Sequence, residues 1–405
     1  MRYPFVLLAL ASLPALAQTP SQALAQKWDT ICATAQSGTT LLVRCDETAT
    51  SSDPNANGTA AVGQHLEEIP GHARVATRDG NASADAFKTV VNERFGLLPG
   101  GAPATLLNVA ASAGLAPDWS LFASLEAGRV ERRSGPNEAA FNADTVHASI
   151  GVNRQLGARL LVGAVLGHDH EALDYSGTIS TADAHYSGLV GFATYSLGGN
   201  WALDAYTGSA HGGFSLLRSV NYVLPKIGGG LYEVNALASA APDTRRSLRG
   251  IALTWDGSHA GWQSELAMGM DESRTEIDGY TESGGGGLAL VVPNRAVQTR
   301  RGRIDARFDR TRSTRWGIWQ PSLRIGWRQE FGNERRRVTV HLAEDSLANP
   351  VSFDTEDPDR SWGELALGSV FTFSHGHSAF FEYRQRFAHA FLQERILAIG
   401  WRMEL

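Results

Sequence analysis

The amino-acid sequence predicts an all-β fold, an antiparallel transmembrane β-barrel of about twelve strands formed by residues 118–405. Two observations predict it. Segments of about ten residues alternate between apolar and polar side chains, and the connections between them are by turns short and long. Charged residues also stand opposite apolar ones on several segments, so one face must be wet while the other meets lipid or a core.

Residues 1–17 are typical of a secretory signal peptide. Arg2 precedes an apolar run at 5–10, and Ala15-Leu16-Ala17 matches the small-x-small cleavage pattern. The run is too short for a membrane anchor and is followed by Pro14. Because no later stretch reaches the roughly 18 to 20 apolar residues of a spanning helix, we expect the exported chain to be soluble or inserted as strands.

Residues 18–80 form a short N-terminal extension that is too small to bury a sizeable core by itself. Only short tracts such as 40–43 and 66–69 are expected to order, and no catalytic constellation is visible. Cys32 and Cys45 can close one small disulfide ring in an oxidising compartment. In the chain-entropy model such a ring stabilises the segment by about 3 kcal/mol. A metal site made from two thiols alone is the less favoured interpretation.

Residues 81–117 are a linker that contains one predicted helix, 83–95, with Ser83 as its N-cap and Gly96 with Pro99 as its stop. One face of this helix is polar, which is unusual in lipid and suits a polar channel. A helix on the periplasmic surface is the alternative. The side chains that we expect in the barrel lumen are Asp85, Phe87, Lys88, Val91, Asn92 and Arg94.

The first six strands are recognised by apolar residues at every second position. A tight turn at 155–158 and another at 198–200 alternate with a long polar loop at about 169–183, and a very long loop follows to about residue 246. The six segments are 119–127, 146–153, 160–166, 185–195, 201–206 and 251–255.

The last six strands continue the alternation to the final residue, with a glycine-rich loop at 284–287 and a short extended piece at 338–342 within the long loops. The segments are 262–270, 303–309, 323–328, 365–373, 381–386 and 397–405. Both barrel ends then lie on the periplasmic side with the short turns. The charges expected to face the lumen are Arg303, Asp305, Arg307, Arg324, Arg328, Glu382 and Arg384.

Tryptophan placement supports a membrane barrel over a soluble sandwich. Nine of the ten tryptophans fall in the strand region, many at strand ends, which is typical of the aromatic girdles at the two membrane interfaces. A soluble sandwich could also alternate, but it would not need loops that alternate in length and would rarely carry charged faces toward its interior.

Four short motifs resemble a known family. They are 203–208 (LDAYTG) with the downstream Arg218, 320–327 (QPSLRIGW), 329–331 (QEF) and 399–405 (IGWRMEL). In this order they resemble the C-terminal translocator domain of autotransporters, the type V secretion system of Gram-negative bacteria, over about residues 85–405.

The resemblance implies a twelve-stranded barrel with a helix in its lumen and an N-terminal passenger exported through or with it. It also implies insertion by the outer-membrane assembly machinery, which reads the last strand; here that strand ends in Leu rather than the usual Phe or Trp. The passenger, residues 18–80, is much smaller than is typical. The residues of the expected assembly signal are Leu397, Ile399, Trp401, Met403 and Leu405.

We therefore expect an outer-membrane autotransporter barrel that anchors and translocates or displays a short passenger, and not an enzyme. The alternatives are a passive pore, and a hydrolase embedded in the barrel. No serine is marked as a nucleophile by its local sequence, and self-cleavage at Asn92 of the helix is not expected. The candidate residues of a hydrolase are His168, Asp169, His170, Asp183 and His185.

The expected partners follow from this placement. They are outer-membrane lipid and lipopolysaccharide, the Sec export route and the barrel assembly machinery, and we expect a monomer. The net charge of −6 argues against a nucleic-acid partner. No cofactor or metal is expected, because His375 and His377 lack further ligands in the sequence.

Overall fold

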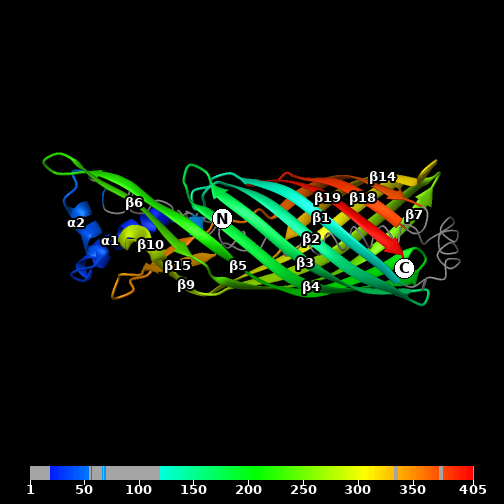
Figure 1. Cartoon of the computed structure of the whole chain (residues 1–405), viewed down its shortest axis with the longest axis horizontal. Coiled ribbons are helices and arrows are strands. Elements are labelled where there is room, and N and C mark those ends of the chain that lie inside the picture. The colour runs from blue at the N-terminus through cyan, green and yellow to red at the C-terminus, as the bar shows by residue number, and fades with distance from the viewer. Residues whose placement is uncertain are drawn as a thin grey trace, which may run out of the picture.

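Twelve antiparallel strands close into a barrel in the computed structural model, which describes residues 19–53, 56, 66, 68–69, 119–332, 336–373 and 377–404. Each strand pairs with the next, and β1 pairs again with β19 to close the ring (Figure 1). The predicted closed barrel is confirmed. The strands are β1 (Trp119–Arg132), β2 (Phe141–Leu156), β3 (Leu160–Tyr175), β4 (Thr181–Gly198), β5 (Trp201–Pro225), β7 (Asp243–His259), β8 (Trp262–Ile277), β12 (Arg295–Arg310), β14 (Gly317–Glu330), β17 (Ser361–Thr372), β18 (His377–Phe387) and β19 (Leu392–Glu404).

Within the apolar belt, the barrel wall has its apolar side chains outside and its charges inside. On β12 the side chain of Ile304 is 51% exposed, whereas its neighbours Arg303 and Asp305 are 8% and 4% exposed. Successive side chains of a strand point to opposite faces. The facing of these three residues therefore determines which side chains of the whole strand face the lumen and which face outward. The arrangement is the reverse of a soluble protein and suits a wall between lipid and a polar lumen.

The strands extend far beyond the apolar belt at one end, an extension that the hydropathy pattern does not indicate. The long polar loop predicted at 169–183 is wrong, because β3 and β4 continue through most of it and leave only residues 176–180 as a connection. Likewise, most of the predicted loop up to residue 246 is strand. There β5 runs on to Pro225 and forms a hairpin with β6 (Leu231–Ala240). Outside a bilayer the outward face need not be apolar, so the hydropathy signal fades although the pairing continues.

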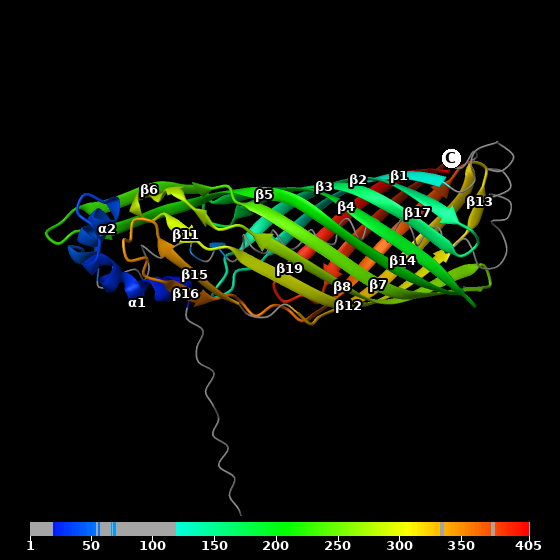
Figure 2. The same ribbon diagram turned by 90° about the horizontal axis from the view of Figure 1, so that it is seen from below.

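Short elements gather beyond this end of the barrel and form what we call the cap. It comprises β6, β9 (Tyr280–Thr281), β10 (Ser283–Gly284), η2 (Gly285–Gly287), β11 (Leu290–Val292), β15 (Arg337–Leu342) and β16 (Val351–Asp354). Four of these strands make a second sheet in the order β16-β15-β11-β9. Figure 2 shows the cap at the end opposite to the C-terminus. The short turns, together with β13 (Arg312–Thr314), lie at the C-terminal end.

Two N-terminal helices pack on the cap, α1 (Pro20–Ala33) and α2 (Thr40–Ala49). Thr19 and Thr39 are their N-caps, and Thr19 forms a capping box with Gln22. In α1 the apolar residues Leu24, Trp28 and Ile31 follow one another at four- and three-residue steps, so they share one buried face. The order predicted for 40–43 corresponds to the start of α2, whereas α1 lies in a stretch with no predicted order.

No helix among the described residues is both long enough and apolar enough to cross a membrane. The predicted signal peptide, residues 1–17, lies outside the described residues. So do the predicted lumen-helix residues and the last residue, namely Asp85, Phe87, Lys88, Val91, Asn92, Arg94 and Leu405.

Candidate functional site

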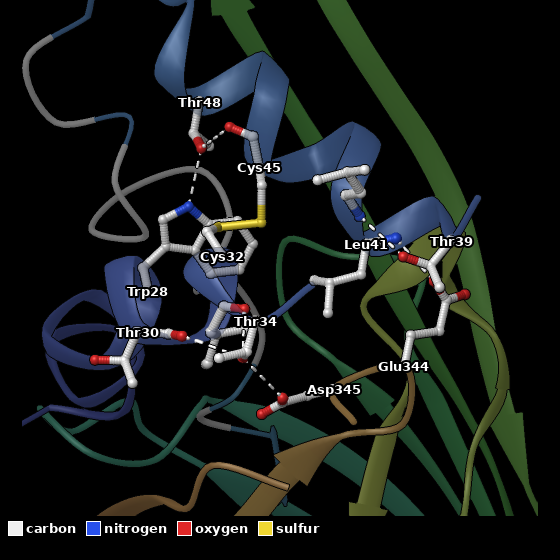
Figure 3. The surroundings of a disulfide bond; sticks show 12 residues. Trp28, Thr30, Cys32, Thr34, Thr39, Leu41, Cys45, Thr48, Glu344 and Asp345 are labelled. Atoms are coloured by element: carbon white, nitrogen blue, oxygen red, sulfur yellow. Dashed lines mark hydrogen bonds between the residues drawn. A yellow bond between two sulfur atoms is a disulfide. The ribbon is translucent and has the colours of Figure 1, made fainter. Parts of the chain in front are cut away.

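The two N-terminal helices form a cross-linked hairpin (Figure 3). A disulfide joins Cys32 of α1 to Cys45 of α2. Beside it the indole Nε1 of Trp28, which is 1% exposed, donates a hydrogen bond of 2.9 Å to Oγ1 of Thr48. The hairpin thus has a covalent link and a satisfied aromatic anchor between its helices. We call residues 19–53 the N-terminal hairpin.

Acidic residues of the loop after β15 bind the N-terminal hairpin. The backbone N–H of Leu41, in the first turn of α2, donates to Glu344 Oε2 at 2.7 Å. A carboxylate at this position satisfies a free helix N–H and also matches the positive end of the helix dipole. Oγ1 of Thr34, at the end of α1, donates to Asp345 Oδ1 at 3.5 Å. The loop therefore contacts both helices (Figure 3).

The chain leaving α2 follows the β5–β6 hairpin. The backbone N–H of Ser52 donates to the carbonyl of Pro225 at 2.9 Å, and the N–H of Ile227 donates to the carbonyl of Thr50 at 3.0 Å. The hydroxyls of Thr50 and Tyr232 are 2.7 Å apart and share a hydrogen bond. Main-chain hydrogen bonds of this kind fix the position of the segment with little dependence on its side chains.

Residues 68 and 69 lie at the mouth of the barrel under the cap. The hydroxyl of Tyr175, at the end of β3, donates to the carbonyl of Glu68 at 2.9 Å. Nη1 of Arg295, at the start of β12, donates to the carbonyl of Ile69 at 3.3 Å. Both barrel residues belong to the end of the wall that carries the cap. Burial raises the pKa of Tyr175 well above its ordinary value.

A buried ion pair holds the glycine-rich part of the cap. Arg218 on β5 donates through Nε and Nη2 to the two carboxylate oxygens of Glu282, at 3.0 and 2.6 Å, and Nη2 also donates to the carbonyl of Leu288 at 2.8 Å. Glu282 in turn accepts from the N–H of Leu290 at 2.9 Å. Burial alone would lower the pKa of Arg218, but the charge and hydrogen bonds of Glu282 outweigh it and the pKa is raised.

The lumen face carries a second set of ion pairs. Arg328 Nη1 lies 2.7 Å from Asp305 Oδ1, and its Nη2 lies 2.8 Å from Glu364 Oε2, so one guanidinium joins three strands. Arg324 Nη2 lies 2.7 Å from Glu382 Oε1. All seven charges predicted to face the lumen point inward, with side chains 6 to 13% exposed: Arg303, Asp305, Arg307, Arg324, Arg328, Glu382 and Arg384.

The last strand contributes an outward apolar face. β19 pairs with β18 on one side and with β1 at the closing seam on the other. Leu397, Ile399 and Trp401 are 43%, 49% and 38% exposed on the outer wall. Met403 is partly buried and follows them on the same face. Not every tryptophan faces outward: Trp362 is 5% exposed inside the wall, with Arg386 5.2 Å from its ring.

The candidate hydrolase residues divide between the two faces of the wall. Asp169 points inward and is hydrogen-bonded to the buried ring of His147. His168 and His170 lie on the outer wall, where His168 Nδ1 is 2.9 Å from Ser187 Oγ and His170 Nε2 is 3.7 Å from Asp183. His185 is also exposed on that wall, paired in register with His170. No three His, Cys, Asp or Glu side chains within the described part of the chain gather as a metal site.

Sequence reasoning missed the residues that build the cap. Arg218 belongs to a recognisable motif, but Glu282 and Glu344 stand in no motif. Their partners are far away in the sequence, and both acids stand in stretches that read as polar loops. The one usable signal was an isolated arginine on the continuation of β5, next to hydrophobic residues, because a charge in such a place requires a partner.

The comparisons with known proteins agree with this geometry. The sequence model of the family described as "Autotransporter beta-domain" matches residues 121–384. The translocator domain of the autotransporter NalP from Neisseria meningitidis superposes with a TM-score of 0.61 at 12% identity, covering 84% of this chain and 98% of that one. The β-domain of the Bordetella autotransporter BrkA superposes with a TM-score of 0.51 at 19% identity, covering 71% and 100%. No curated protein matches the chain.

Proposed function

The chain belongs to the autotransporter β-domain family of outer-membrane barrels, and from this premise we propose that it displays residues 18–80 as a short passenger docked on its own cap. The observation that carries the proposal is the contact between the N-terminal hairpin and the cap, made by Glu344 and Asp345. The long connections of such barrels face the outside of the cell and the short turns face the periplasm. A segment bound to the cap is therefore on the cell surface.

The two ends of the linker support passage through the lumen. Ile69 contacts Arg295 at the cap end, whereas Trp119 begins β1 at the short-turn end. Residues 70–118 join these ends, so we propose that this linker, with the helix predicted at 83–95, crosses the membrane inside the barrel. The ion pairs of the lumen offer donors and acceptors to a polar segment there, while the membrane-spanning part of the outer wall is mainly apolar.

The route to this state is proposed from the family. Export through the inner membrane would use the Sec route, and insertion would use the barrel assembly machinery. The outward row Leu397, Ile399 and Trp401 on β19 is the surface that we expect that machinery to read.

The test uses two variants, each with one protease site, at opposite ends of the barrel. A specific cleavage sequence inserted at Ser37-Gly38 lies in the exposed turn between α1 and α2, where Gly38 has no heavy atom within 4 Å of an added Cβ. The matched control carries the same insertion at Gly199-Asn200, the exposed short turn between β4 and β5. Protease added to intact cells should cut only the first variant. Protection of the hairpin insertion, with cleavage after the outer membrane is opened, would contradict surface display.

A separate measurement tests the path of the linker. Deleting residues 83–98 should raise the ion conductance of the purified barrel in planar bilayers, because the lumen would lose its plug. Unchanged conductance would favour a helix on the periplasmic surface and would leave the display proposal to the protease experiment alone.

A further inference from the structure

An apolar hollow of about 560 Å³ lies on the outer wall of the barrel, across β7, β8, β12 and β14. One outward position that lines it, Gly302, has no side chain. Ile251, Met270, Gly302 and Gln329 form one register row, and Gly302 stands in the middle. A Cβ added at Gly302 would lie 2.8 Å from Cε2 of Phe331, so that ring leans over the gap. The side chains around the hollow include Ile251, Met268, Met270, Ile304, Trp327 and Phe331.

Cationic side chains stand directly above this hollow, on the side toward the cap. Two residues along each strand, the next outward row consists of Arg249, Glu272 and Arg300. The side chains of the two arginines are 69% and 54% exposed. Arg249 Nη2 lies 2.8 Å from the Glu272 carboxylate, and Arg300 Nε lies 3.6 Å from it. The carbonyl of Arg300 accepts a 2.7 Å hydrogen bond from the N–H of Phe331, which joins the charged row to the rim of the hollow.

More cationic side chains lie on the outer wall between this row and the cap. Arg274 and Arg245 lie on the outward face in the next rows, and His211 is paired in register with Arg245. Glu276 lies 2.9 Å from Arg274. This stretch of outer wall therefore has a net charge of +2 from four arginines and two glutamates: Arg245, Arg249, Arg274, Arg300, Glu272 and Glu276. Exposed cations facing the membrane surface attract anionic headgroups, and the planar guanidinium binds phosphate through two parallel hydrogen bonds.

We infer that this hollow and the arginines above it form a binding site for a phosphorylated, multiply acylated glycolipid of the outer leaflet, the chemistry of lipopolysaccharide. One acyl chain lies in the hollow beside Gly302, and phosphate groups lie against Arg249 and Arg300. The charge stands on the cap side of the hollow, which is the outer-leaflet side of the wall. The inference depends on the membrane placement of the barrel and is independent of passenger display.

Binding of purified bis-phosphorylated, hexa-acylated lipid A to the full-length protein in detergent tests the site. The double variant Arg249→Ser/Arg300→Ser should bind about 10- to 30-fold more weakly. Arg310→Ser is the matched control: it removes an exposed arginine from the same strand β12, but at the short-turn end, where Arg310 lies 5.6 Å from the Trp262 ring. The control should bind as the wild type does.

A second variant tests the hollow itself. Gly302→Leu places side-chain atoms at the hollow, and the nearest atoms that must move to admit them belong to the Phe331 ring; lipid A binding should weaken as well. All variants are compared at equal amounts of folded protein, judged by the heat-modifiable band on a gel. An acyl-free glucosamine bisphosphate should not displace lipid A, and dephosphorylated lipid A should not distinguish the wild type from the double variant. Equal weakening by Arg310→Ser, or full displacement by the acyl-free compound, would overturn the inference.

Discussion

Replacing one partner of the Arg218–Glu282 pair should loosen the cap without opening the barrel. Both side chains are almost fully buried, at 2% and 1% exposure. Arg218→Met removes three donated hydrogen bonds and leaves the Glu282 carboxylate with the N–H of Leu290. Breaking a buried pair in this way costs about 3 to 5 kcal/mol. Glu282→Gln should cost a similar amount, because it leaves the guanidinium buried without its counter-charge.

The double variant shows whether the interaction between Arg218 and Glu282 causes the loss of cap stability in the single variants. With both charges gone, the loss should stay near that of either single variant, so the coupling energy should be about as large as one single loss, about 3 to 5 kcal/mol. Hydrogen–deuterium exchange of the amides in β11 and in the N-terminal hairpin measures the local opening free energy. Arg249→Met is the matched control, since Arg249 is 69% exposed in its ion pair with Glu272 and should contribute about 0 to 1 kcal/mol. Additive losses in the double variant would refute the argument.

Three other substitutions test separate parts of the structure. Cys32→Ser/Cys45→Ser should raise amide exchange in α1 and α2, with a loss of about 3 kcal/mol in the chain-entropy model; unchanged exchange would show that packing alone holds the hairpin. Trp28→Ala should cost about 3 to 5 kcal/mol and make the hairpin sensitive to surface protease, whereas Lys27→Ala, at an exposed position, should not. Ile399→Arg, in the apolar belt, should destabilise the barrel by about 2 to 4 kcal/mol and lower the temperature at which the folded gel band disappears; an unchanged temperature would place Ile399 outside the lipid.

The membrane-spanning part of the fold was readable from the sequence because each side chain there has only two possible surroundings. In residues 303–309 every charged side chain is inside and every apolar one is outside. The alternation alone therefore predicts both the strand and the side of the wall that each side chain faces. The ends of the strands were not readable in the same way. β12 begins at Arg295 and ends at Arg310, beyond the apolar belt on both sides, where the outward face no longer has to be apolar.

The cap was not predictable because its strands break the two-sided pattern. Tyr222 and Leu224 of β5 are buried, at 5% and 0% exposure, yet Val223 between them is also apolar and 55% exposed. By periodicity alone, a continuous run of apolar residues cannot be told apart as a buried strand or a buried helix segment. Helix α1 was missed for another reason. Its buried face belongs to the same core as Val351 and Phe353 of β16, and local sequence cannot show a partner so distant.

The shared core sets the order in which this molecule can fold. The N-terminal hairpin is too small to be stable by burial alone, and its Trp28 and Leu41 belong to one core with Val351 and Phe353, which lie in the connection between β14 and β17. If the hairpin is displayed as proposed, that core can form only when the hairpin and this connection are on the same side of the membrane. The disulfide can close earlier, because Cys32 and Cys45 both lie within the hairpin. Export would then carry a small cross-linked but unpacked segment, and docking on the cap would complete its fold only after the barrel is in place.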